Sequence, residues 1–549
     1  MKIILFLIFI LWLVKISRDI LFWVYLWQLK EYRRDRMRAH FELASSKKTF
    51  FNKLYFGKIA LLLSAPILFM DIWSFFFPIA TAIFYVALGL RSVYSIYLKD
   101  LKEPVFTRKA IALCGISVIP LVVFSFLFFY KASAQVFFAA LLALDTIAPL
   151  IVAGAVGFSR YPSDYFKTKT LQRAARRRSI LKDLLTIGIT GSYGKTSMKE
   201  LLAHILSAKL KVAKTPANSN SEIGVANCVL SSIPDDSDVF IVEMGAYKEG
   251  EIKRICEIVK PQIGILTGIN EQHISLFGSL EQIIKAKYEL IESLPKSGLA
   301  IFNGENDYTR ALYEKTRVPK RMYSLRTFNV SARPDIAAEK IDFIPQSLTK
   351  SEGQTKNGMQ FYVRLGNKKE FFETKLLGRH NVLNILGASL VACGLGMSLE
   401  EIKEQVKTFN PPPHTLNILP GINGSMIIDD SYSANPRGAM AALDVLDGLR
   451  GGKKILVMYP LIELGKTASH VHRRLGIRIN KVCDICILIS SDFSREIRKN
   501  APNTDVFVMR DPQIAIAKLA KNLKAGDIVL LENRVPEEIK TALIAVNVE

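Results

Sequence analysis

The chain has 549 residues, of which 50% are hydrophobic and 22% charged, with a mean hydropathy of +0.21 and a formal net charge of +23. At roughly 150 residues per domain, this length predicts three or four units and excludes a single soluble domain. Ordinary contents of 32 Gly and 22 Pro, together with the high apolar content, exclude a disordered or collagen-like polymer.

The positive charge is concentrated in the N-terminal third. Residues 1–182 contain 26 Lys and Arg against 9 Asp and Glu, and the same third holds the longest apolar runs. Basic residues beside apolar runs are typical of membrane flanks, and no nucleic-acid-binding motif accompanies them. We therefore expect a membrane partner and no nucleic acid. Six scattered cysteines indicate a reduced compartment, and we interpret the CxxC of Cys483 and Cys486 as core residues.

Residues 1–160 predict a membrane region with four or five transmembrane helices. Residues 110–130 and 72–90 are uncharged runs of 21 and 19 residues, long enough to cross about 30 Å of hydrocarbon as helices. Further candidates are the apolar runs at residues 132–158, 59–70 and 3–14.

Charged residues interrupt or border these runs. Lys15, Arg18 and Asp19 leave two alternatives for the first candidate, a kinked span or a helix that lies in the membrane interface. Asp145 interrupts the run at 132–158, and an intramembrane carboxylate can mark a transport pathway, which keeps a transporter as a minor alternative. Asp71 is expected in a short outer turn.

The distribution of basic residues predicts the orientation of these helices. Residues 29–58 carry nine Lys or Arg, residues 91–109 carry five and residues 159–182 carry eight, whereas the turn at Lys131 carries one. Positive loops face the cytoplasm, so we expect a multi-pass protein of the cell (inner) membrane with cytoplasmic catalytic domains. Residues 161–182 are then a basic juxtamembrane linker that contacts anionic lipid.

The remaining two thirds predict two α/β domains, at residues 183–410 and 411–549. Short β-branched runs alternate there with amphipathic stretches, the pattern of βαβ units and parallel sheets. Three consecutive prolines at 411–413 predict a hinge, and residues 320–372 are expected as an insertion with small strands. The expected main strands are 185–190, 238–245, 262–269, 298–304, 425–432, 453–460, 485–491, 505–510 and 527–533.

The strongest chemical signal is TIGITGSYGKTSMKELLAHIL, an apolar strand followed by a glycine loop and a helix. Backbone N–H groups in such a loop surround phosphate oxygens, Lys195 reaches the terminal phosphates and Thr196 can ligate Mg²⁺. Ile189 stands where the strict motif has glycine, but the flanking strand and helix favour a nucleotide loop over a chance turn. The predicted nucleotide-binding residues are Gly191, Ser192, Tyr193, Gly194, Lys195, Thr196 and Ser197.

Glu243 and His273 are candidates for a metal site beside that phosphate. Each follows the carboxyl end of a predicted strand, where ligands bind in open parallel sheets. Together with Thr196 they predict Mg²⁺ between the β- and γ-phosphates. Taken singly, each would be a helix cap or a surface residue, and Lys287 would be an ordinary lysine on a helix face.

Five ordered motifs resemble those of the Mur ligases, and the resemblance covers residues from about 183 to the C-terminus. It implies a central P-loop-type ATPase domain, a C-terminal Rossmann-like α/β domain, and amide synthesis from ATP through an acyl phosphate. Such chemistry depends on positioning and on neutralising phosphate charge. The motifs are TGSYGKTS, IVEMGAYKEGEI, TGINEQHISLFGSLEQIIKAKYELI, GRHNVLNILGA and DDSYSANPRGAM.

The resemblance implies roles for individual residues. Lys195, Lys287 and His273 would be catalytic. Magnesium would be held by Thr196, Glu243, His273 and a carbamylated Lys287, because carbamylation turns the lysine cation into an anion.

The resemblance also implies nucleotide and substrate contacts. Nucleotide would be contacted by Asn381 and Asn384 at the adenine and by Asp430 at the ribose or elsewhere on ATP. Substrate would be contacted by Asn218, Asn220 and Asn435.

The chain departs from the family pattern near the hinge and on the amine side. His414 and Thr415 stand where the family has an arginine. YPLIELG (459–465) replaces GDMLELG, and LENR (531–534) replaces KGSR. The membrane region stands in place of the soluble domain that recognises a UDP-sugar peptide. These departures leave the ATP motifs in place.

Three functions follow as hypotheses. The first is the addition of D-Ala-D-Ala to a muramoyl peptide, a small-molecule or lipid-linked precursor of the peptidoglycan cell wall. The second is another amide ligase of the family, with a lipid-linked or polyglutamate-type substrate. The third is a non-catalytic membrane scaffold that keeps the ligase fold.

Overall fold

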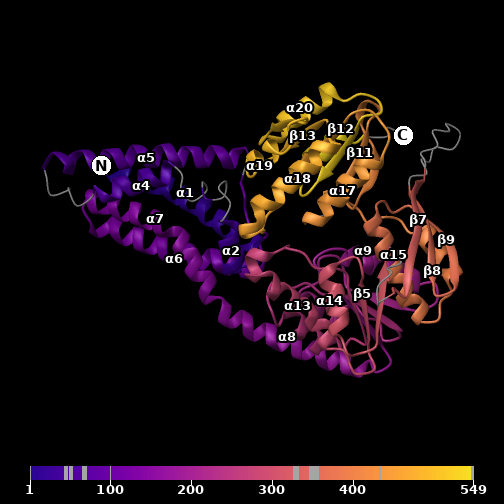
Figure 1. Cartoon of the computed structure of the whole chain (residues 1–549). Helices are drawn as coiled ribbons and strands as arrows, with labels where there is room; N and C mark the ends of the chain where they lie inside the picture. Colours follow the sequence, from indigo (N-terminus) through magenta and orange to yellow (C-terminus); the bar gives the residue numbers. More distant parts are fainter. Residues whose placement is uncertain are drawn as a thin grey trace. The chain divides into compact units, whose positions relative to one another are not determined.

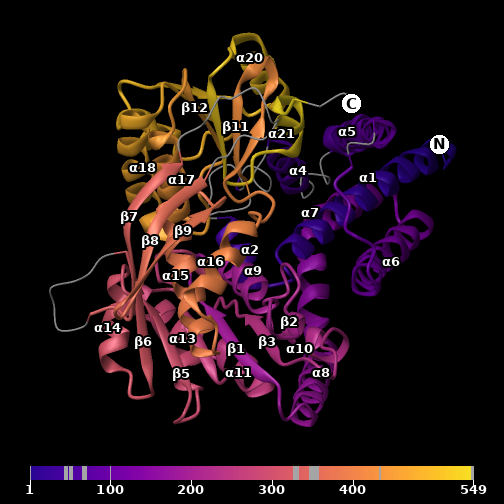
Figure 2. The same cartoon turned by 90° about the vertical axis from the view of Figure 1, so that its right-hand side faces the viewer.

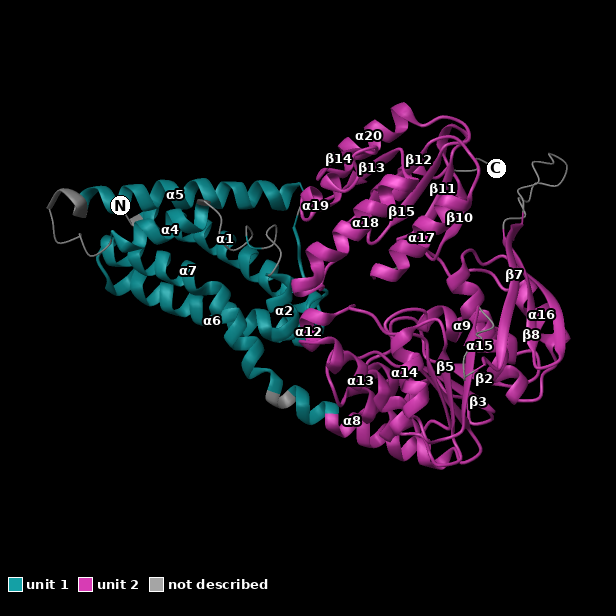
Figure 3. Cartoon of the chain, in the orientation of Figure 1, with its two compact units in different colours: residues 1–167 teal, residues 168–549 magenta. Residues whose placement is uncertain are grey.

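The structure of the chain is a computed structural model, and it divides into two compact units. Unit 1 comprises residues 1–167 and unit 2 residues 168–549 (Figure 3). The residues that the structure describes are 2–41, 47, 53–64, 71–98, 101–325, 333–344, 358–431 and 435–545.

Unit 1 is helical. By length and composition, three helical stretches of its described residues are long and apolar enough to cross a membrane: Phe75–Tyr97, Arg108–Lys131 and Ala134–Ile180, the last of which continues into unit 2. Asp71 is the first residue of a helix, and the residues just before it are not described, so the turn expected there stays a prediction. Residues 65–70 of the apolar run predicted at 59–70 lie outside the described residues. The helices are α1 (Lys2–Leu29), α2 (Arg34–His40), α4 (Lys53–Leu63), α5 (Asp71–Tyr97), α6 (Arg108–Lys131), α7 (Ala134–Phe158) and α8 (Arg160–Ile180).

Helix α1 is continuous over 28 residues and forms much of the core of unit 1. Trp12, Ile16, Ile20 and Val24 are fully buried and recur every four residues, so they share one face of the helix. This face packs among α5, α6 and α7. The charged residues Lys15, Arg18 and Asp19 therefore lie within one continuous helix, and the choice between a span and an interfacial helix stays a prediction.

Residues 161–182, expected as a basic linker, lie mostly in helix α8. Arg178, near the end of this helix, is 5% exposed. Its guanidinium donates hydrogen bonds to the carbonyl oxygens of Val259 (3.0 Å) and Leu184 (2.7 Å). The C-terminal turns of α8 are thus part of the packed structure of unit 2.

The first sheet of unit 2 has nine strands in the described residues, in the order β2-β3-β1-β4-β5-β6-β7-β8-β9 (Figure 2). The pairs from β2 to β7 are parallel, and β8 and β9 add antiparallel pairs. Strands β3 and β4 are buried throughout, as the continuous apolar runs of a parallel sheet require. The strands are β1 (Leu185–Thr190), β2 (Val212–Lys214), β3 (Val239–Glu243), β4 (Ile263–Leu266), β5 (Leu299–Asn303), β6 (Lys320–Ser324), β7 (Ile336–Ile344), β8 (Gly358–Leu365) and β9 (Lys368–Thr374).

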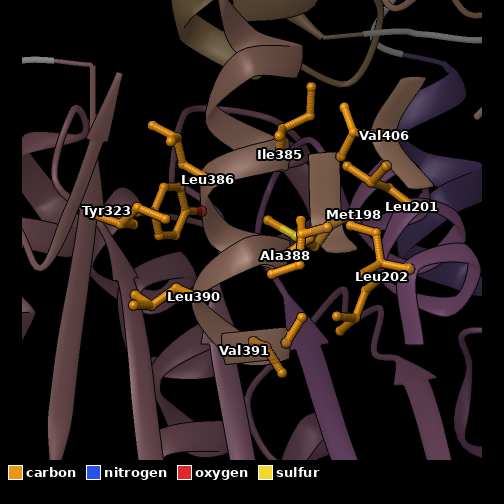
Figure 4. Packing of buried hydrophobic residues seen from close by; sticks show 14 of the residues in the cluster. Met198, Leu201, Leu202, Tyr323, Ile385, Leu386, Ala388, Leu390, Val391 and Val406 are labelled. Atoms are coloured by element: carbon orange, nitrogen blue, oxygen red, sulfur yellow. The ribbon is translucent and has the colours of Figure 1, made fainter. Parts of the chain in front are cut away.

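Helices cover both faces of this sheet, with a separate apolar cluster on each face. Figure 4 shows the first cluster, in which Met198 and Leu202 of α9 lie near Ala388 and Ile385 of α15. All four side chains are buried. The helices are α9 (Lys195–Leu206), α10 (Glu222–Ser231), α11 (Glu251–Val259), α12 (Ile274–Phe277), α13 (Leu280–Glu292), α14 (Asp307–Lys315), α15 (Arg379–Gly394) and α16 (Leu399–Thr408).

The segment 320–372, expected as an insertion, contributes β6, β7, β8 and most of β9 to the same sheet. Met359, Phe361 and Val363 of β8 are at most 1% exposed and alternate with more exposed neighbours. Because alternate side chains of a strand face the same side, this face of β8 joins the first apolar cluster. The segment therefore extends the sheet.

The second sheet of unit 2 has six described strands, in the order β10-β11-β15-β12-β13-β14. Only the edge pair β10–β11 is antiparallel. The three prolines at 411–413 lie between α16 and β10, where the chain leaves the first sheet for the second (Figure 1). The strands are β10 (Asn417–Pro420), β11 (Met426–Asp430), β12 (Lys454–Met458), β13 (Ile485–Leu488), β14 (Asp505–Val508) and β15 (Ile528–Glu532); the helices are α17 (Pro436–Gly448), α18 (Ala468–Val482), α19 (Ser494–Lys499), α20 (Pro512–Asn522) and α21 (Glu537–Leu543).

All six cysteines are free, as their scattered spacing predicts. Cys483 and Cys486 are buried in an apolar cluster of the second sheet, and Cys486 lies on β13. The interpretation of this CxxC as core residues is confirmed.

Candidate active site

The glycine loop connects β1 to α9, as the sequence predicts. Gly194 caps α9 with a left-handed φ of 75°, a conformation that residues with a Cβ rarely adopt. At Gly191 a Cβ would lie 2.1 Å from Thr267 Oγ1, so a side chain has no room there. The two glycines thus let the backbone turn tightly into the N-terminus of α9, which is a natural site for phosphate.

Lys195 is the first residue of α9, and its ammonium donates a hydrogen bond to the Gly191 carbonyl oxygen at 2.9 Å. Burial lowers the pKa of this amine, and the Glu243 carboxylate partly opposes that shift. The Lys195 side chain therefore folds back over the glycine loop, where it could contact a bound phosphate group.

Glu243 ends strand β3 and is 4% exposed. Thr196 Oγ1 and Asn220 Nδ2 donate hydrogen bonds to its two carboxylate oxygens, each at 3.0 Å. The Lys199 ammonium lies 3.5 Å from the carboxylate. The predicted pairing of Glu243 with Thr196 is present, and Asn220, predicted as a substrate residue, orients the carboxylate.

Lys199 is a residue of the site for which the sequence predicted no role. It is fully buried and lies one helical turn after Lys195, so it is on the same face of α9. The usable signal is a second lysine at the i+4 position of a helix that otherwise presents apolar residues to the core.

His273 caps the short helix α12, beyond the end of β4, with a left-handed φ of 62°. Its Nδ1 lies 2.6 Å from Glu463 Oε2, and the Tyr247 ring packs edge-on against it at 5.0 Å. Burial lowers the pKa of the imidazole, and Glu463 partly opposes that shift. Glu463 belongs to the YPLIELG motif, which follows β12 of the second sheet. No role for Glu463 was predicted from the sequence.

Lys287 lies on α13 and is only 4% exposed, so it is not an ordinary solvated lysine of a helix face. Burial, followed by the positive charge of Lys195, lowers the pKa of its amine to about 7. The same electrostatic neighbourhood includes Glu243, and Lys287 in turn acts on His273. The structure thus brings together the predicted catalytic and metal-binding residues.

A pocket of about 820 Å³ opens beside the glycine loop, between residues of the two sheets of unit 2. Its lining includes Lys195 and Thr196 from the first sheet domain and Asp430 from β11. Such a volume suits a nucleotide and part of a second substrate. The other predicted residues that line it are Tyr193, Gly194, Ser197, Asn381, Asn384 and Asn435.

Asn381 and Asn384 lie in the first turns of α15. Asn384 Nδ2 donates to Asn381 Oδ1 at 3.1 Å, and Asn381 Nδ2 donates to the Leu377 carbonyl oxygen at 2.9 Å. A Cβ at Gly194 would lie 3.1 Å from Asn384 Oδ1, so this amide borders the glycine loop.

Asn435 and Asn218 have local backbone roles. Asn435 Oδ1 caps α17 by accepting a hydrogen bond from the Gly438 N–H at 2.9 Å. Asn218 has a left-handed φ of 62° in the loop before α10. Of these two asparagines, Asn435 lines the pocket, whereas Asn218 is not among its described lining residues.

Arg437 is a further residue that the sequence analysis missed. Its Nη1 donates a hydrogen bond to Tyr193 Oη at 2.7 Å, and its guanidinium lies 5.5 Å from the centre of the Tyr193 ring. The side chain brings a fixed positive charge from α17 to the glycine loop. Its place two residues after Asn435 in the DDSYSANPR motif was the available signal.

Magnesium can be tested against the donors in this site. The Thr196 hydroxyl and the Glu243 carboxylate are adjacent hard oxygen ligands, and Mg²⁺ commonly uses one or two such groups together with substrate phosphates and water. Among the described residues, no group of three or more His, Cys, Asp and Glu forms a complete metal cage. The residues therefore fit a metal that arrives with nucleotide.

The comparisons with known proteins match this architecture. Residues 189–392 match the Mur ligase middle domain, and residues 416–532 match the Mur ligase, glutamate ligase domain. The chain belongs to the Mur ligase family.

Three relatives of this Mur ligase chain illustrate the match. The chain is 30% identical over 313 residues to the UDP-N-acetylmuramoyl-tripeptide--D-alanyl-D-alanine ligase of Bacillus subtilis. The match covers 56% of this chain and 63% of the relative. The chain thus spans less than two thirds of the length of that protein. A MurF structure from Acinetobacter baumannii superimposes with a TM-score of 0.60 at 26% identity, covering 68% of this chain and 80% of the other. MurF from Thermotoga maritima in complex with ADP shares the fold, with a TM-score of 0.57 at 23% identity over 68% and 84% of the chains.

The position of the family's hinge arginine is occupied by a different ionic group in this Mur ligase chain. His414 Nδ1 lies 2.8 Å from Asp429 Oδ2, and the Lys540 ammonium lies 3.2 Å from the same oxygen. The neighbouring Thr415 lines the pocket.

The two altered motifs of the second sheet contact each other. Asn533, in LENR, donates through Nδ2 to the carbonyl oxygens of Tyr459 (2.7 Å) and Pro460 (3.1 Å), in YPLIELG. Glu532 is the register partner of Asp430, and both carboxyl groups are buried. Burial raises the pKa of Asp430 to about 7 and, together with the neighbouring Asp430, raises the pKa of Glu532.

Proposed function

We propose that the chain is an ATP-dependent ligase that forms an amide bond through an acyl phosphate. One observation carries this proposal: Lys195 and Thr196, which follow the glycine loop, line a pocket that Asp430 of the second sheet also lines, and Thr196 donates a hydrogen bond to Glu243. Membership of the Mur ligase family supports the same chemistry.

The proposed reaction has two steps. An oxygen of the substrate carboxylate attacks the γ-phosphorus of ATP, the bond to the bridging oxygen breaks, and ADP leaves. The neutral amine of the second substrate then attacks the acyl carbon, inorganic phosphate leaves, and the nitrogen loses a proton as the amide forms. Both steps concentrate negative charge on phosphate oxygens, so positioned cations and N–H donors give most of the catalysis.

Residues around the glycine loop would bind the phosphate groups and Mg²⁺. Lys195 would exchange its hydrogen bond to the Gly191 carbonyl for one to a phosphate oxygen, while backbone N–H groups of the loop hold the other oxygens. Thr196 and Glu243 would hold Mg²⁺, with His273 as a further ligand. Bound there, Mg²⁺ neutralises phosphate charge.

Lys287 would contribute as a carbamate. Its amine would react with CO₂ to form an N-carboxylate with loss of one proton, and the resulting anion would help to hold Mg²⁺. The burial of Lys287 among charged groups supports this role, because a buried cation beside Lys195 is repelled.

We further propose the addition of D-alanyl-D-alanine to a muramoyl peptide of the cell-wall precursor, as the name of the Bacillus subtilis relative describes for that protein. A second candidate is an amide ligase of the family with a different amine or a lipid-linked carboxylate. The contacts of Asn533 with Tyr459 and Pro460 favour this candidate, because they join the two altered motifs inside the second sheet domain.

We propose that unit 1 spans the cell membrane several times and that unit 2 lies in the cytoplasm. The three long apolar helical stretches and the basic residues of the loops support this placement. The exposed basic residues of α8, including Arg173 and Arg176, would contact anionic lipid. A chain that starts at residue 168 should be soluble and bind ATP, whereas one that starts at residue 182 loses the contacts of Arg178 and should be less stable.

The ligase assay uses the purified full-length chain with ATP and Mg²⁺. UDP-linked muramoyl tripeptide and D-Ala-D-Ala are supplied together and singly, and phosphate release and product mass are recorded. Ligation with both substrates supports the first candidate. ATP turnover only with another amine or a lipid-linked carboxylate supports the second, and no turnover with any pair supports a scaffold.

A further inference from the structure

Unit 1 contains a charged pocket of about 240 Å³ that the ligase chemistry does not use. It lies among helices α1, α4, α5 and α7, all of which contribute residues. The charged lining residues are Lys15, Arg18, Asp19, Lys58, Arg91 and Asp145, and the others are Trp23, Leu54, Tyr55, Leu88, Ser92, Ala148 and Pro149.

Asp145 is the most buried carboxylate of this pocket, with 2% exposure. It pairs with Lys15, and its other oxygen lies 3.0 Å from the Lys58 ammonium. Tyr85 Oη donates to the same oxygen at 3.3 Å. Since the carboxylate already has three partners, it is better explained as a counter-ion of the lysines than as a step in a transport pathway.

The charges of the lining do not balance. Four cations, Lys15, Lys58, Arg18 and Arg91, face two carboxylates, Asp19 and Asp145. Asp19 is itself 2.8 Å from the Lys15 ammonium, so both carboxylates act on the same lysine. The lining therefore has an excess of two positive charges, carried by the half-buried Arg18 and the exposed Arg91. An anion of charge one or two would compensate it.

The donor groups favour a phosphate group as this anion. Arginine presents a planar fork of N–H donors that matches phosphate oxygens, and lysine adds a point charge. Arg18 already donates to Ser92 Oγ at 3.3 Å, which directs it to the helix that carries Arg91. The pocket is smaller than the roughly 300–1,000 Å³ of a site that encloses a whole small molecule. It would hold one head group and leave the rest of the ligand outside.

The remaining lining residues favour a lipid as the source of that phosphate. Trp23 and Tyr55 are the residue types that gather at the head-group level of membranes. Leu54, Leu88 and Ala148 add apolar surface that hydrated inorganic phosphate does not need. The pocket therefore combines phosphate donors with surface suited to acyl chains.

We propose that this pocket binds the phosphate head group of an anionic lipid. The inference rests on the proposed membrane location of unit 1, but it is independent of the ligase activity of unit 2. Arg18 and Arg91 would bind the phosphate oxygens, while Lys15 and Lys58 keep Asp145 as their counter-ion.

Tryptophan fluorescence offers a selective measurement. The four tryptophans of the chain all lie in unit 1, and one of them lines the pocket; they are Trp12, Trp23, Trp27 and Trp73. The full-length chain is placed in phosphatidylcholine nanodiscs, and emission and thermal unfolding are followed as phosphatidic acid is added. We expect a saturable emission change and a higher unfolding temperature with phosphatidic acid. Inorganic phosphate at millimolar concentration should produce neither.

Two variants and a control test the assignment. Arg91→Gln and Arg18→Gln should each weaken phosphatidic acid binding about tenfold, the effect of losing one charge-assisted hydrogen bond. Arg108→Gln is the matched control, because Arg108 is an exposed arginine at the start of α6 and does not line the pocket. It should bind as the unsubstituted chain does.

Three results would overturn the proposal. Saturation by inorganic phosphate would identify a free anion as the ligand. Equal weakening by Arg108→Gln and Arg91→Gln would mean general attraction to a charged bilayer. Unchanged binding in both pocket variants would mean that the excess charge has another counter-ion. None of these readouts involves ATP, so active ligase with no lipid response contradicts this inference alone, and a lipid response without ligation contradicts only the proposed enzyme function.

Discussion

The two sheet domains of unit 2 differ in how closely they keep the family pattern. Around the first sheet, the glycine loop, Glu243 and His273 occur with family spacing, and the structure brings them together with Lys287. Around the second sheet, the YPLIELG and LENR motifs depart from the family and contact each other. We infer from this difference that the proposed nucleotide site and the proposed amine site can change separately within one fold.

Two side chains of the second sheet domain contact residues of the first. Glu463 reaches His273, and Arg437 reaches Tyr193 of the glycine loop. A change on the amine side can therefore alter the nucleotide side at these two contacts. Variants of each region should be measured for both ATP turnover and amine use, to test whether the two regions act separately.

The largest effect is expected for Lys195→Ala, next to the glycine loop of the first sheet domain. Loss of a phosphate contact should lower ATP turnover by about 10³-fold, the upper range for removing one group that stabilises developing charge. Lys209→Ala is the control, because Lys209 pairs with Glu401 at the surface of the same domain. Phosphate release measures turnover, and circular dichroism checks the fold. Unchanged turnover in Lys195→Ala would contradict the catalytic assignment.

Lys287→Ala should lower ligation by about 10²-fold, because the site loses an anion that would hold metal. Short-chain carboxylic acids added to the assay should restore part of the activity by occupying the vacated space. Lys287→Arg should stay inactive, since arginine does not form the carbamate. An active arginine variant would show that the residue acts only as a cation.

Glu463→Gln tests whether the amine-side domain influences the nucleotide side. The variant keeps the size of the side chain but weakens its bond to His273, and loss of such a supporting contact commonly costs 10-fold to 100-fold in metal affinity or activity. We expect about a tenfold higher Mg²⁺ requirement with little change in the KM for the amine. Glu496→Gln, which alters a half-buried contact of the same domain with Ser469, is the control. A change in amine KM alone would place Glu463 only in amine recognition.

The smallest effect concerns the pH dependence of nucleotide binding. Burial raises the pKa of Asp430 to about 7, so this carboxyl is ionised, and able to accept from a ribose hydroxyl, mainly above that pH. ATP affinity should rise a few-fold between pH 6 and pH 8, measured by calorimetry. Asp430→Asn should remove the part of this dependence that does not come from ATP itself. The same dependence in both proteins would exclude Asp430 as its source.

Asp430 has an opposite effect on stability. Its pKa of about 7 in the folded chain lies above the ordinary value of 3.8, so the folded state keeps a proton that the unfolded state releases between these two values. The folded state thus binds more protons in this range, and the free energy of unfolding falls as the pH rises from about 4 to about 7. Asp430→Asn should flatten that decline in chemical denaturation experiments.

Local patterns in the sequence predicted the strands and the glycine loop because their signals are short-range. β1, β3, β4 and β5 all fall within the predicted runs. The segment 320–372 was harder to interpret, because its antiparallel strands lack the alternating helices that mark βαβ units. Helix α8 was expected as a linker, since its basic composition hides the buried Arg178.

The missed site residues depend on long-range pairing. Glu463 lies 190 positions from His273, and Arg437 lies 244 positions from Tyr193. No local spacing reports such contacts. Glu243 and His273 could be predicted because they stand at or beyond the carboxyl ends of β3 and β4, and the ends of neighbouring parallel strands meet at one edge of the sheet.

The contact between His273 and Glu463 also determines the protonation pattern of the neutral imidazole. A carboxylate at 2.6 Å from Nδ1 accepts a hydrogen bond, so the ring proton stays on Nδ1 and the lone pair stays on Nε2. The second sheet domain thereby selects the tautomer of a histidine that belongs to the first. Glu463 lies in the part of YPLIELG that is the same as in GDMLELG, so the changes around it leave Nε2 as the nitrogen that can serve as a metal ligand.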